Sequence, residues 1–405
     1  MNKLNVKYLL VILLICNSLL AQGFLSTKGR AIVDAKGEIV QLKGVNLGFW
    51  LMPEGYWWNL SNDLTPKEYF YLFADLVGPE VSRKFWKEFQ DKFITQEDIR
   101  YIKKLGFNHV RLPFDYRLFA NEYFLGSYQP RGFELLDRAI NWCGEEGLWV
   151  ILDMHAAPGG QAGWHSDDGN THAWLFEDGG EVYQQQTIDI WKSIAQRYAD
   201  NPTIIGYDLI NEPIHQYCDT TKLYPRLEPF YKKLTSAIRE VDKNHILFIG
   251  GVYWNRNFDY FTKPFDPNLV YVTHLYNFTH DYTSLEYYKA FSERHNVPIW
   301  LGEFGEVNPE FVKTCRTWCE KHKLPWTLWS YKKLNNDHCI VQIPAPENWE
   351  LISDYSKACF NRYVERVQGR PDIKLARKAL DDFLVNCQFE NVIPSKFYLE
   401  ALGLE

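Results

Sequence analysis

Two glutamates stand at the ends of apolar runs, at positions where core packing does not require a charge. Glu212 follows Asn211 at the end of "IIGYDLINEP", and Glu303 lies within "PIWLGEFG". Two carboxyl groups that face each other across a cleft can hydrolyse a glycosidic bond, because one protonates the leaving oxygen while the other attacks the anomeric carbon. Their surroundings must then differ, so that one carboxyl is protonated while the other is ionised.

Other apolar runs also end in polar or aromatic residues, namely Arg111, Asp153, His155, His274, Tyr276 and Trp329. His274 and Tyr276 can supply hydrogen bonds, and Arg111 a positive charge, that hold a nucleophilic carboxylate ionised. We therefore expect Glu303 to be the nucleophile and Glu212 the acid/base. Asn211, beside Glu212, is placed to bind the sugar 2-hydroxyl.

Eight apolar, β-branched runs recur along the chain, and segments with helical spacing separate them. The runs begin at Ile39, His109, Leu148, Ile204, His245, Leu269, Pro298 and Pro325. Strand and helix alternating eight times predict an α/β fold, a (β/α)₈ TIM barrel, whose catalytic groups lie at the carboxyl ends of the strands. An open doubly wound sheet would want a glycine-rich phosphate turn after its first strand, and "GVNLGFWLMPEG" is not one.

The barrel is expected to occupy residues 23–365. Residues 1–22 have the charged, apolar, small-residue order of a signal peptide, which predicts a secreted or periplasmic protein with no transmembrane segment in its mature chain. "GRAIVDAKGEIVQL" predicts a β-hairpin with its turn at Lys36–Gly37, placed to close the barrel floor. Residues 366–405 are expected to form a helical extension packed on the barrel.

Seven cysteines follow residue 22, so at least one cannot pair within the chain. We interpret Cys315 and Cys319 as buried thiols or a local bridge, because no CxxC or His-x-His accompanies them. The net charge of -7 and the absence of a long basic run argue against nucleic acid as a partner. The 16% of aromatic residues suit a protein that stacks sugar rings, so we expect an oligo- or polysaccharide substrate.

A long loop rich in Gly, His, Asp and Trp follows the third predicted strand. A cation could bind among its side chains, which are His155, His165, Asp167, Asp168 and His172. Two opposed glutamates already supply a complete mechanism, so we expect no cofactor and no catalytic metal. If the loop binds a cation, we expect that cation to be structural rather than catalytic. Trp164, Trp174 and Phe176 could pin the loop, and we expect one of the two tryptophans to serve a sugar subsite.

The chain resembles glycoside hydrolase family 5, the cellulase-type retaining β-glycosidases. The resemblance runs from about Gly29 to Trp329 through "RLPF", "LDMHAAPGGQ", "INEP", "HLY", "LGEFGE" and "WSYK", in the family's order. It implies a (β/α)₈ barrel in which Glu212 is the acid/base and Glu303 the nucleophile. The resemblance also implies that the rest of the active site consists of Arg111, His155, Asn211, His274, Tyr276 and Trp329.

Two segments, "NLGFWLMPEGY" and "HAAPGGQAGWHSDDG", are similar to the exo-β-1,3-glucanase branch of that family. This similarity implies that Glu54, and with it Gln161, contacts the terminal sugar. Phe49 stands where that branch has glycine, and "THLY" lacks its second histidine. The predicted activity is hydrolysis of a β-glucan, and the similarity favours exo action on β-1,3 or β-1,6 linkages.

Five alternatives remain open from the sequence. An endo-acting β-1,4-glucanase, or a glycosidase for another β-linked glycan or glycoside, would use the same two glutamates. An inverting enzyme would need them about 6.5–9.5 Å apart rather than about 5 Å. A carbohydrate-binding barrel without catalysis would be expected to have lost one glutamate, and a metal-dependent barrel hydrolase would want an HxH at the first strand.

Overall fold

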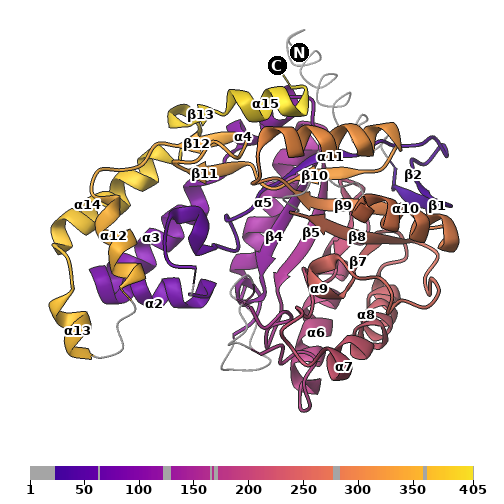
Figure 1. The fold of residues 1–405 in the computed structure, drawn as a ribbon, viewed down its shortest axis with the longest axis horizontal. Coiled ribbons are helices and arrows are strands. Elements are labelled where there is room, and N and C mark those ends of the chain that lie inside the picture. The colour runs from indigo at the N-terminus through magenta and orange to yellow at the C-terminus, as the bar shows by residue number, and fades with distance from the viewer. Residues whose placement is uncertain are drawn as a thin grey trace, which may run out of the picture.

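A closed barrel of eight parallel strands forms the centre of the molecule (Figure 1). The computed structural model describes residues 23–62, 64–121, 129–164, 167, 172–276, 283–358 and 363–404. In chain order the barrel strands are β3 (Lys43–Asn46), β4 (His109–Asp115), β5 (Trp149–Ala156), β6 (Ile204–Asp208), β7 (Ile246–Gly250), β8 (Leu269–Leu275), β9 (Ile299–Phe304) and β10 (Trp326–Leu328). The barrel closes where β10 pairs with β3, so the predicted fold is confirmed.

Helices alternate with the barrel strands and cover them from outside. They include α4 (Gln96–Lys104), α5 (Arg131–Glu145), α6 (Glu181–Tyr198), α8 (Leu227–Val241), α10 (Thr283–His295) and α11 (Pro309–Lys321). Helices on the outside and packed side chains inside bury both faces of a parallel strand, which explains the nearly continuous apolar runs. Local signals fix the helix ends: Thr95 and Asp98 form a capping box at the start of α4.

A hairpin closes the barrel floor, but its turn differs from the predicted one. Strands β1 (Ser26–Lys28) and β2 (Ala31–Val33) pair across Gly29, which has a φ of +58°. The predicted turn at Lys36–Gly37 also forms, yet only one bridge, between Val33 and Ile39, follows it. The hairpin does pack against the barrel interior, where Ile32 joins a buried apolar cluster with residues of β5 to β9.

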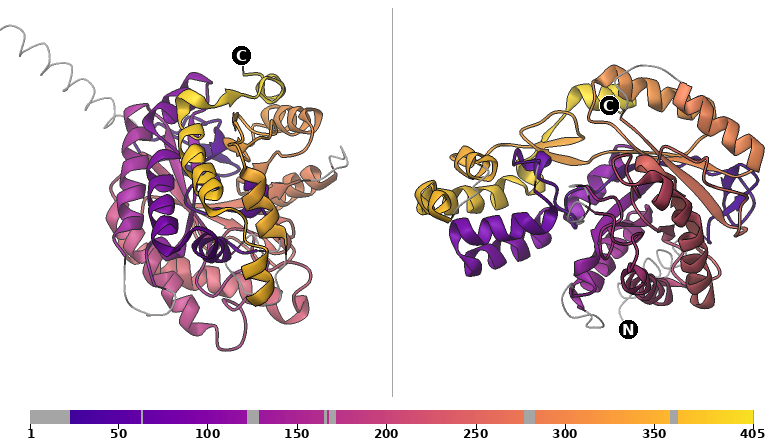
Figure 2. Two further views of the ribbon diagram at one scale, coloured as in Figure 1. Left: turned by 90° about the vertical axis from the view of Figure 1, so that its left-hand side faces the viewer. Right: turned by 60° about the horizontal axis from the view of Figure 1, so that its bottom comes forward.

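A helical lobe lies beside the barrel (Figures 1 and 2), and its two helices from the first part of the chain were not among the predicted elements. It combines α2 (Pro66–Val77) and α3 (Pro79–Lys92) with three segments from the other end of the chain, α12 (Trp349–Lys357), α13 (Tyr363–Gln368) and α14 (Ile373–Asn386). Trp58, which precedes α2, stacks on Phe383 of α14 with ring centroids 4.9 Å apart. Aromatic packing therefore joins segments more than 300 residues apart.

The remaining elements continue the chain beyond the barrel. Strands β11 (Lys332–Leu334), β12 (Val341–Ile343) and β13 (Ile393–Pro394) form a small sheet, and α15 (Lys396–Leu402) packs on α11. Short elements at the barrel mouth are α7 (Thr220–Leu223) and α9 (Val252–Asn255). Across the described ranges, no helix has the length and apolar character needed to cross a membrane.

The predicted signal peptide and Cys359 lie outside the described residues. The six described cysteines after residue 22 are free thiols, and Cys315 and Cys319 are both buried on α11. This agrees with the interpretation of that pair as buried thiols.

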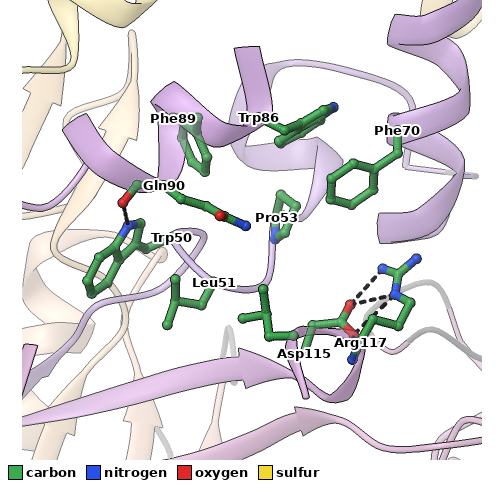
Figure 3. A pocket seen from close by; sticks show the side chains of 10 residues that line it. Trp50, Leu51, Pro53, Phe70, Trp86, Phe89, Gln90, Asp115 and Arg117 are labelled. Carbon is green, nitrogen blue, oxygen red and sulfur yellow. Dashed lines mark hydrogen bonds and ion pairs between the residues drawn. The ribbon is translucent and has the colours of Figure 1, made fainter. Parts of the chain in front are cut away.

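An apolar pocket of about 250 Å³ lies between the lobe and the barrel. Phe70, Trp86 and Phe89 of the lobe face Leu51 and Pro53 across it (Figure 3). The charged residues on its wall, Asp115 and Arg117, bind each other at 2.6 Å. The opposed glutamates lie elsewhere, so this pocket offers no acid/base pair.

A buried lysine ties the lobe to the barrel. Lys332 on β11 is fully buried, and its Nζ binds Asp98 Oδ1 at 2.8 Å. The same Nζ donates to the carbonyl oxygens of Phe93, after α3, at 2.7 Å and of Cys387, after α14, at 2.9 Å. Asp98 also accepts hydrogen bonds from Thr95 at the start of α4. One ammonium group therefore joins β11, α3, α4 and α14.

We predict that Lys332→Met lowers the free energy of unfolding by about 3–5 kcal/mol, because it leaves the Asp98 carboxylate buried without its counter-charge. Urea unfolding followed by circular dichroism measures this difference. The matched control is Lys43→Met on β3, which breaks an ion pair with Glu320 that is 40% and 27% exposed. The control should cost less than about 1 kcal/mol. Equal losses in the two variants would contradict the assigned role of Lys332.

Candidate active site

A pocket of about 220 Å³ opens at the carboxyl ends of the barrel strands. Its walls are formed by Glu54, Tyr56, His155, Trp164, Glu212, Trp254, Arg256, Tyr276, Glu303, Glu306 and Trp329. The other predicted site residues, Arg111, Asn211 and His274, lie beneath it and hydrogen-bond to these walls. All nine residues predicted for the site therefore meet in one place.

Glu303 accepts a hydrogen bond on each of its carboxylate oxygens. It lies near the end of β9, where Arg111 Nη1 donates to Oε1 at 2.5 Å. Tyr276, after β8, donates from its hydroxyl to Oε2 at 2.8 Å. A carboxylate that accepts hydrogen bonds from a guanidinium and a phenol is fixed in position.

Arg111 connects Glu303 to the neighbouring strands. Its guanidinium is fully buried on β4 and binds Asp153 of β5 at 3.0 Å and Asp208 of β6 at 2.9 Å. It also donates to the amide oxygens of Asn46 and Asn211, at 3.0 and 2.8 Å. The amide of Asn211 is therefore oriented by Arg111, with its nitrogen 3.3 Å from His155 Nε2.

Glu212 occupies a strained backbone position above this network. Strand β6 ends at Asp208, before Asn211 and Glu212 where its end was predicted, and Glu212 and Ile214 have φ values of +42° and +49°. Burial raises the pKa of Glu212 above 4.5, while the positive charges of His155, Arg256 and Arg111 oppose the shift. A carboxyl with a raised pKa is suited to hold a proton that it can donate.

His274 lies between the two glutamates. Its Nδ1 is 2.7 Å from Glu212 Oε1 and 3.4 Å from Glu303 Oε2. The sequence predicted that His274 would serve Glu303, and this is only partly right, because the shorter contact is to Glu212. Single ligand atoms of the three residues all lie within 4.8 Å of one another, so the two carboxyl groups are close together.

Asn255, at the end of α9, orients His274. Its Nδ2 lies 3.1 Å from His274 Nε2 and donates to it. Burial lowers the pKa of His274 to about 3, so the imidazole is neutral. With Nε2 accepting, the proton resides on Nδ1 and points at Glu212. The sequence missed Asn255, whose φ of +59° lies in the left-handed region that asparagine tolerates better than most residues.

Glu212, His274 and Glu303 are close enough to bind a metal ion together. The proton on His274 Nδ1 makes that atom a donor, however, and a metal ligand must offer a lone pair. In the loop after β5, Asp167 accepts hydrogen bonds from the backbone amides of Ala162 and Gly163, so its carboxylate already anchors the loop. His165 and Asp168 lie outside the described residues.

Glu54 and His155 form the opposite, acidic end of the pocket together with Tyr56, Glu306 and Trp329. Burial raises the pKa of Glu54 to about 7, although the His155 side chain opposes this at 3.6 Å. Burial also disfavours charge on His155, yet Asp153 at 2.8 Å, aided by Glu54 and Glu303, raises its pKa to about 10. Glu54 Oε1 is buried and makes no hydrogen bond among the described residues, and His155 Nε2 at 3.6 Å is its ion-pair partner.

Phe49 shows how this chain departs from the branch that it resembles. Its φ of +69° explains why glycine suits the position, since side chains adopt this conformation only at a cost. The ring is fully buried, stacks on Trp57 at 5.0 Å and meets Trp329 edge-on at 5.2 Å. Trp329 in turn stacks on His155. Aromatic packing under the pocket therefore offsets the strain at Phe49.

The residues predicted to bind sugar from the loop after β5 lie in different places. Gln161 was predicted to contact the sugar, but it is buried and its amide binds the backbone of His155, Ala157 and Asn211. It braces two loops instead. Trp164 lines the pocket, whereas Trp174 is 42% exposed and lies outside it.

Sequence reasoning missed Tyr56, Trp254, Arg256 and Glu306 on the pocket wall. The sequence did contain a signal for Trp254 and Arg256. Both lie in "GGVYWNRN", which comes directly after the fifth apolar run, and the other site residues likewise lie at the ends of apolar runs. The strand-end rule, applied to β7 as well, would have found Trp254 and Arg256.

Residues 73–335 match the family model described as Cellulase (glycosyl hydrolase family 5). The chain is 33% identical to a beta-xylosidase of Phanerodontia chrysosporium over 355 residues, which are 77% of this chain and 71% of that protein. It is 37% identical to endoglucanase C of Acetivibrio thermocellus, over 48% of this chain and 55% of that protein. It is 30% identical to a glucan 1,3-beta-glucosidase of Candida oleophila, over 50% of this chain and 48% of that protein. The chain thus spans about half the length of the last two relatives.

We predict that His274 is a neutral Nδ1–H tautomer throughout the range from pH 8 to pH 5, because burial lowers its pKa to about 3. Nitrogen NMR of the protein labelled at histidine measures both the charge and the tautomer. Asn255→Ala should allow the Nε2–H tautomer to appear. The control is Asn257→Ala in the same loop, whose side chain accepts instead from the backbone of Asp259. Protonation of His274 near pH 6.5, or a tautomer unchanged in Asn255→Ala, would contradict this assignment.

Proposed function

Because the chain belongs to glycosyl hydrolase family 5, we propose that it is a retaining β-glycosidase with Glu303 as nucleophile and Glu212 as acid/base. The observation that supports this best is the closeness of the two carboxyl groups, with an oxygen of each within 4.8 Å of the other. Carboxyl groups about 5–5.5 Å apart suit a covalent two-step reaction, whereas an inverting enzyme needs about 6.5–9.5 Å to admit a water molecule.

In the first step, Glu303 attacks the anomeric carbon and forms the glycosyl-enzyme bond. Glu212 gives its proton to the glycosidic oxygen as the bond between that oxygen and the anomeric carbon breaks. In the second step, the Glu212 carboxylate takes a proton from water, and the water oxygen attacks the anomeric carbon and releases Glu303. Since Glu212 must begin protonated, the first step slows as the pH rises through its raised pKa.

The residues around the glutamates have distinct parts in this reaction. Arg111 and Tyr276 hold the Glu303 carboxylate in position for attack. His274 donates to Glu212 and therefore stabilises the carboxylate that remains after proton transfer. Asn211, oriented by Arg111, is placed to bind the sugar 2-hydroxyl.

The proposed substrate is a β-glucan, attacked from its non-reducing end at β-1,3 or β-1,6 linkages. Glu54 supports this choice, because it lines the acidic end of the pocket, where a terminal sugar would present hydroxyl groups. Similarity to a glucan 1,3-beta-glucosidase favours the same substrate, while similarity to an endoglucanase favours internal cleavage. We also propose that residues 1–22 direct export, which would bring the enzyme to extracellular or periplasmic glycans.

We predict that Glu303→Gln abolishes turnover with folding intact, because an amide cannot form the glycosyl-enzyme ester. Glu212→Gln should lose activity on substrates with poor leaving groups by at least about a hundredfold, while aryl glycosides with acidic phenols lose less. Steady-state kinetics and circular dichroism measure both effects. Glu310→Gln is the charge-matched control, exposed at the start of α11. Substantial turnover by Glu303→Gln would show that the nucleophile is another residue.

We predict that glucose is the main product from a β-1,3- or β-1,6-glucan. A panel of β-1,3-, β-1,6- and β-1,4-glucans, with product sizes resolved by chromatography, tests this. Glu54→Gln should lower kcat/KM on the preferred glucan by roughly tenfold, because a charge-assisted hydrogen bond to the terminal sugar is lost. Early release of long oligosaccharides from a β-1,4-glucan would instead identify an endo-acting enzyme.

A further inference from the structure

Arg256 lies in a strained turn at the mouth of the barrel. The turn follows β7, and Tyr253, Trp254 and Asn255 have φ values of +57°, +54° and +59°. Three successive residues other than glycine in this region are costly, so surrounding contacts must hold them. The turn is held through the Arg256 backbone, whose amide donates to Val252 O and whose carbonyl accepts from the Tyr288 hydroxyl at 3.0 Å.

The Arg256 side chain reaches the active-site pocket without a counter-charge. Its guanidinium lies 5.8 Å from the ring centroids of both Tyr253 and Trp254. Its Nε is buried without a hydrogen-bond partner, and no carboxylate of the described residues lies within ion-pair distance. Arg111, by contrast, is bonded on all sides. Because Arg256 lines the pocket and no carboxylate pairs with it, an anion that enters the pocket can pair with its guanidinium.

The position of Arg256 identifies the side of the pocket that it serves. Its charge acts on Glu212, the proposed acid/base. Trp254 beside it faces Trp164 at 6.2 Å, and Trp164 packs on His215 in the loop that carries Glu212. Glu54, Tyr56 and Glu306 belong to the other end, where Tyr56 binds Glu306 and Trp329. Since the acid/base protonates the leaving oxygen, the end with Arg256 faces the leaving group.

We propose that Arg256 binds an anionic group on the leaving-group side of the substrate. The enzyme would then prefer β-glycosides whose aglycone or next residue carries a carboxylate or a phosphate. Both groups present oxygens that a guanidinium binds through paired hydrogen bonds. The aromatic rings of Tyr253 and Trp254 hold the guanidinium in place, so little side-chain freedom is lost on binding. This inference rests on the proposed function, because that function defines the leaving-group side.

The test uses three aryl β-glucosides with leaving groups of similar acidity. They carry a carboxymethyl, a phosphonomethyl or a neutral carbamoylmethyl group at the para position. For the wild-type chain, we expect kcat/KM to be higher for at least one anionic compound than for the amide. In Arg256→Gln, the ratio of anionic to neutral kcat/KM should fall roughly tenfold to a hundredfold, the effect of losing a charge-assisted hydrogen bond.

Two further variants separate this role from simpler ones. Arg256→Lys should restore part of the ratio, because it keeps the charge but loses the planar pair of donors. Arg100→Gln removes an exposed arginine on α4 and should leave the ratio unchanged. If Arg256→Gln slows all three substrates equally, Arg256 acts only on the charge of Glu212, and the inference is overturned.

A calorimetric measurement distinguishes failure of the inference from failure of the proposed function. If the wild-type chain hydrolyses none of the glucosides, the proposed activity on glucosides is wrong. Binding of the three compounds to the wild-type chain and to Arg256→Gln then decides the inference. Anionic compounds that bind at least about tenfold tighter than the amide, and lose this advantage in the variant, support it. Equal binding of charged and neutral compounds overturns it.

Discussion

The buried guanidinium of Arg111 is the constraint on which the active site depends. It contacts Asp153, Asp208 and Glu303, three acidic residues from three different strands. Removing four ionisable groups from water is unfavourable unless each finds partners, so the three acidic residues must stay at contact distance from Arg111. Burial, followed by the charges of Asp153 and Glu303, raises the pKa of Asp208 to about 8 despite its contact with Arg111.

The two ends of the pocket follow from this fixed floor. Arg111 holds Glu303 and Asn211, and the strained turn at Glu212 sets the second carboxyl close to the first. On one side, Glu54 and His155 are buried 3.6 Å apart, so the charge of each affects the pKa of the other. On the other side, Trp254 and Arg256 come from a loop with an unusual backbone. One pocket thus has carboxyl groups at one end and, at the other, an arginine without a counter-charge.

Strain at the barrel mouth is matched by packing beneath it and beside it. Phe49 has a backbone conformation that favours glycine, and its buried ring supports Trp329. Lys332, three residues after Trp329, anchors the following strand to the helical lobe. The lobe is thus joined to the segment that carries Trp329. The apolar pocket beside the lobe contains no pair of catalytic residues.

The sequence by itself determined the barrel, the family and the nine residues that meet in the pocket walls or directly beneath them. Parallel strands of one barrel end at the same edge, so a polar residue after each apolar run, as with Glu212 or His274, had to lie near the others. Only the tertiary structure decided that His274 contacts Glu212 more closely than Glu303, that Asn255 sets its tautomer, and that Arg256 lacks a counter-charge. It alone decided that α2 and α3 pack with α14 in one lobe. These features depend on side-chain distances and left-handed backbone turns between residues far apart in the chain, which no local pattern of residue types encodes.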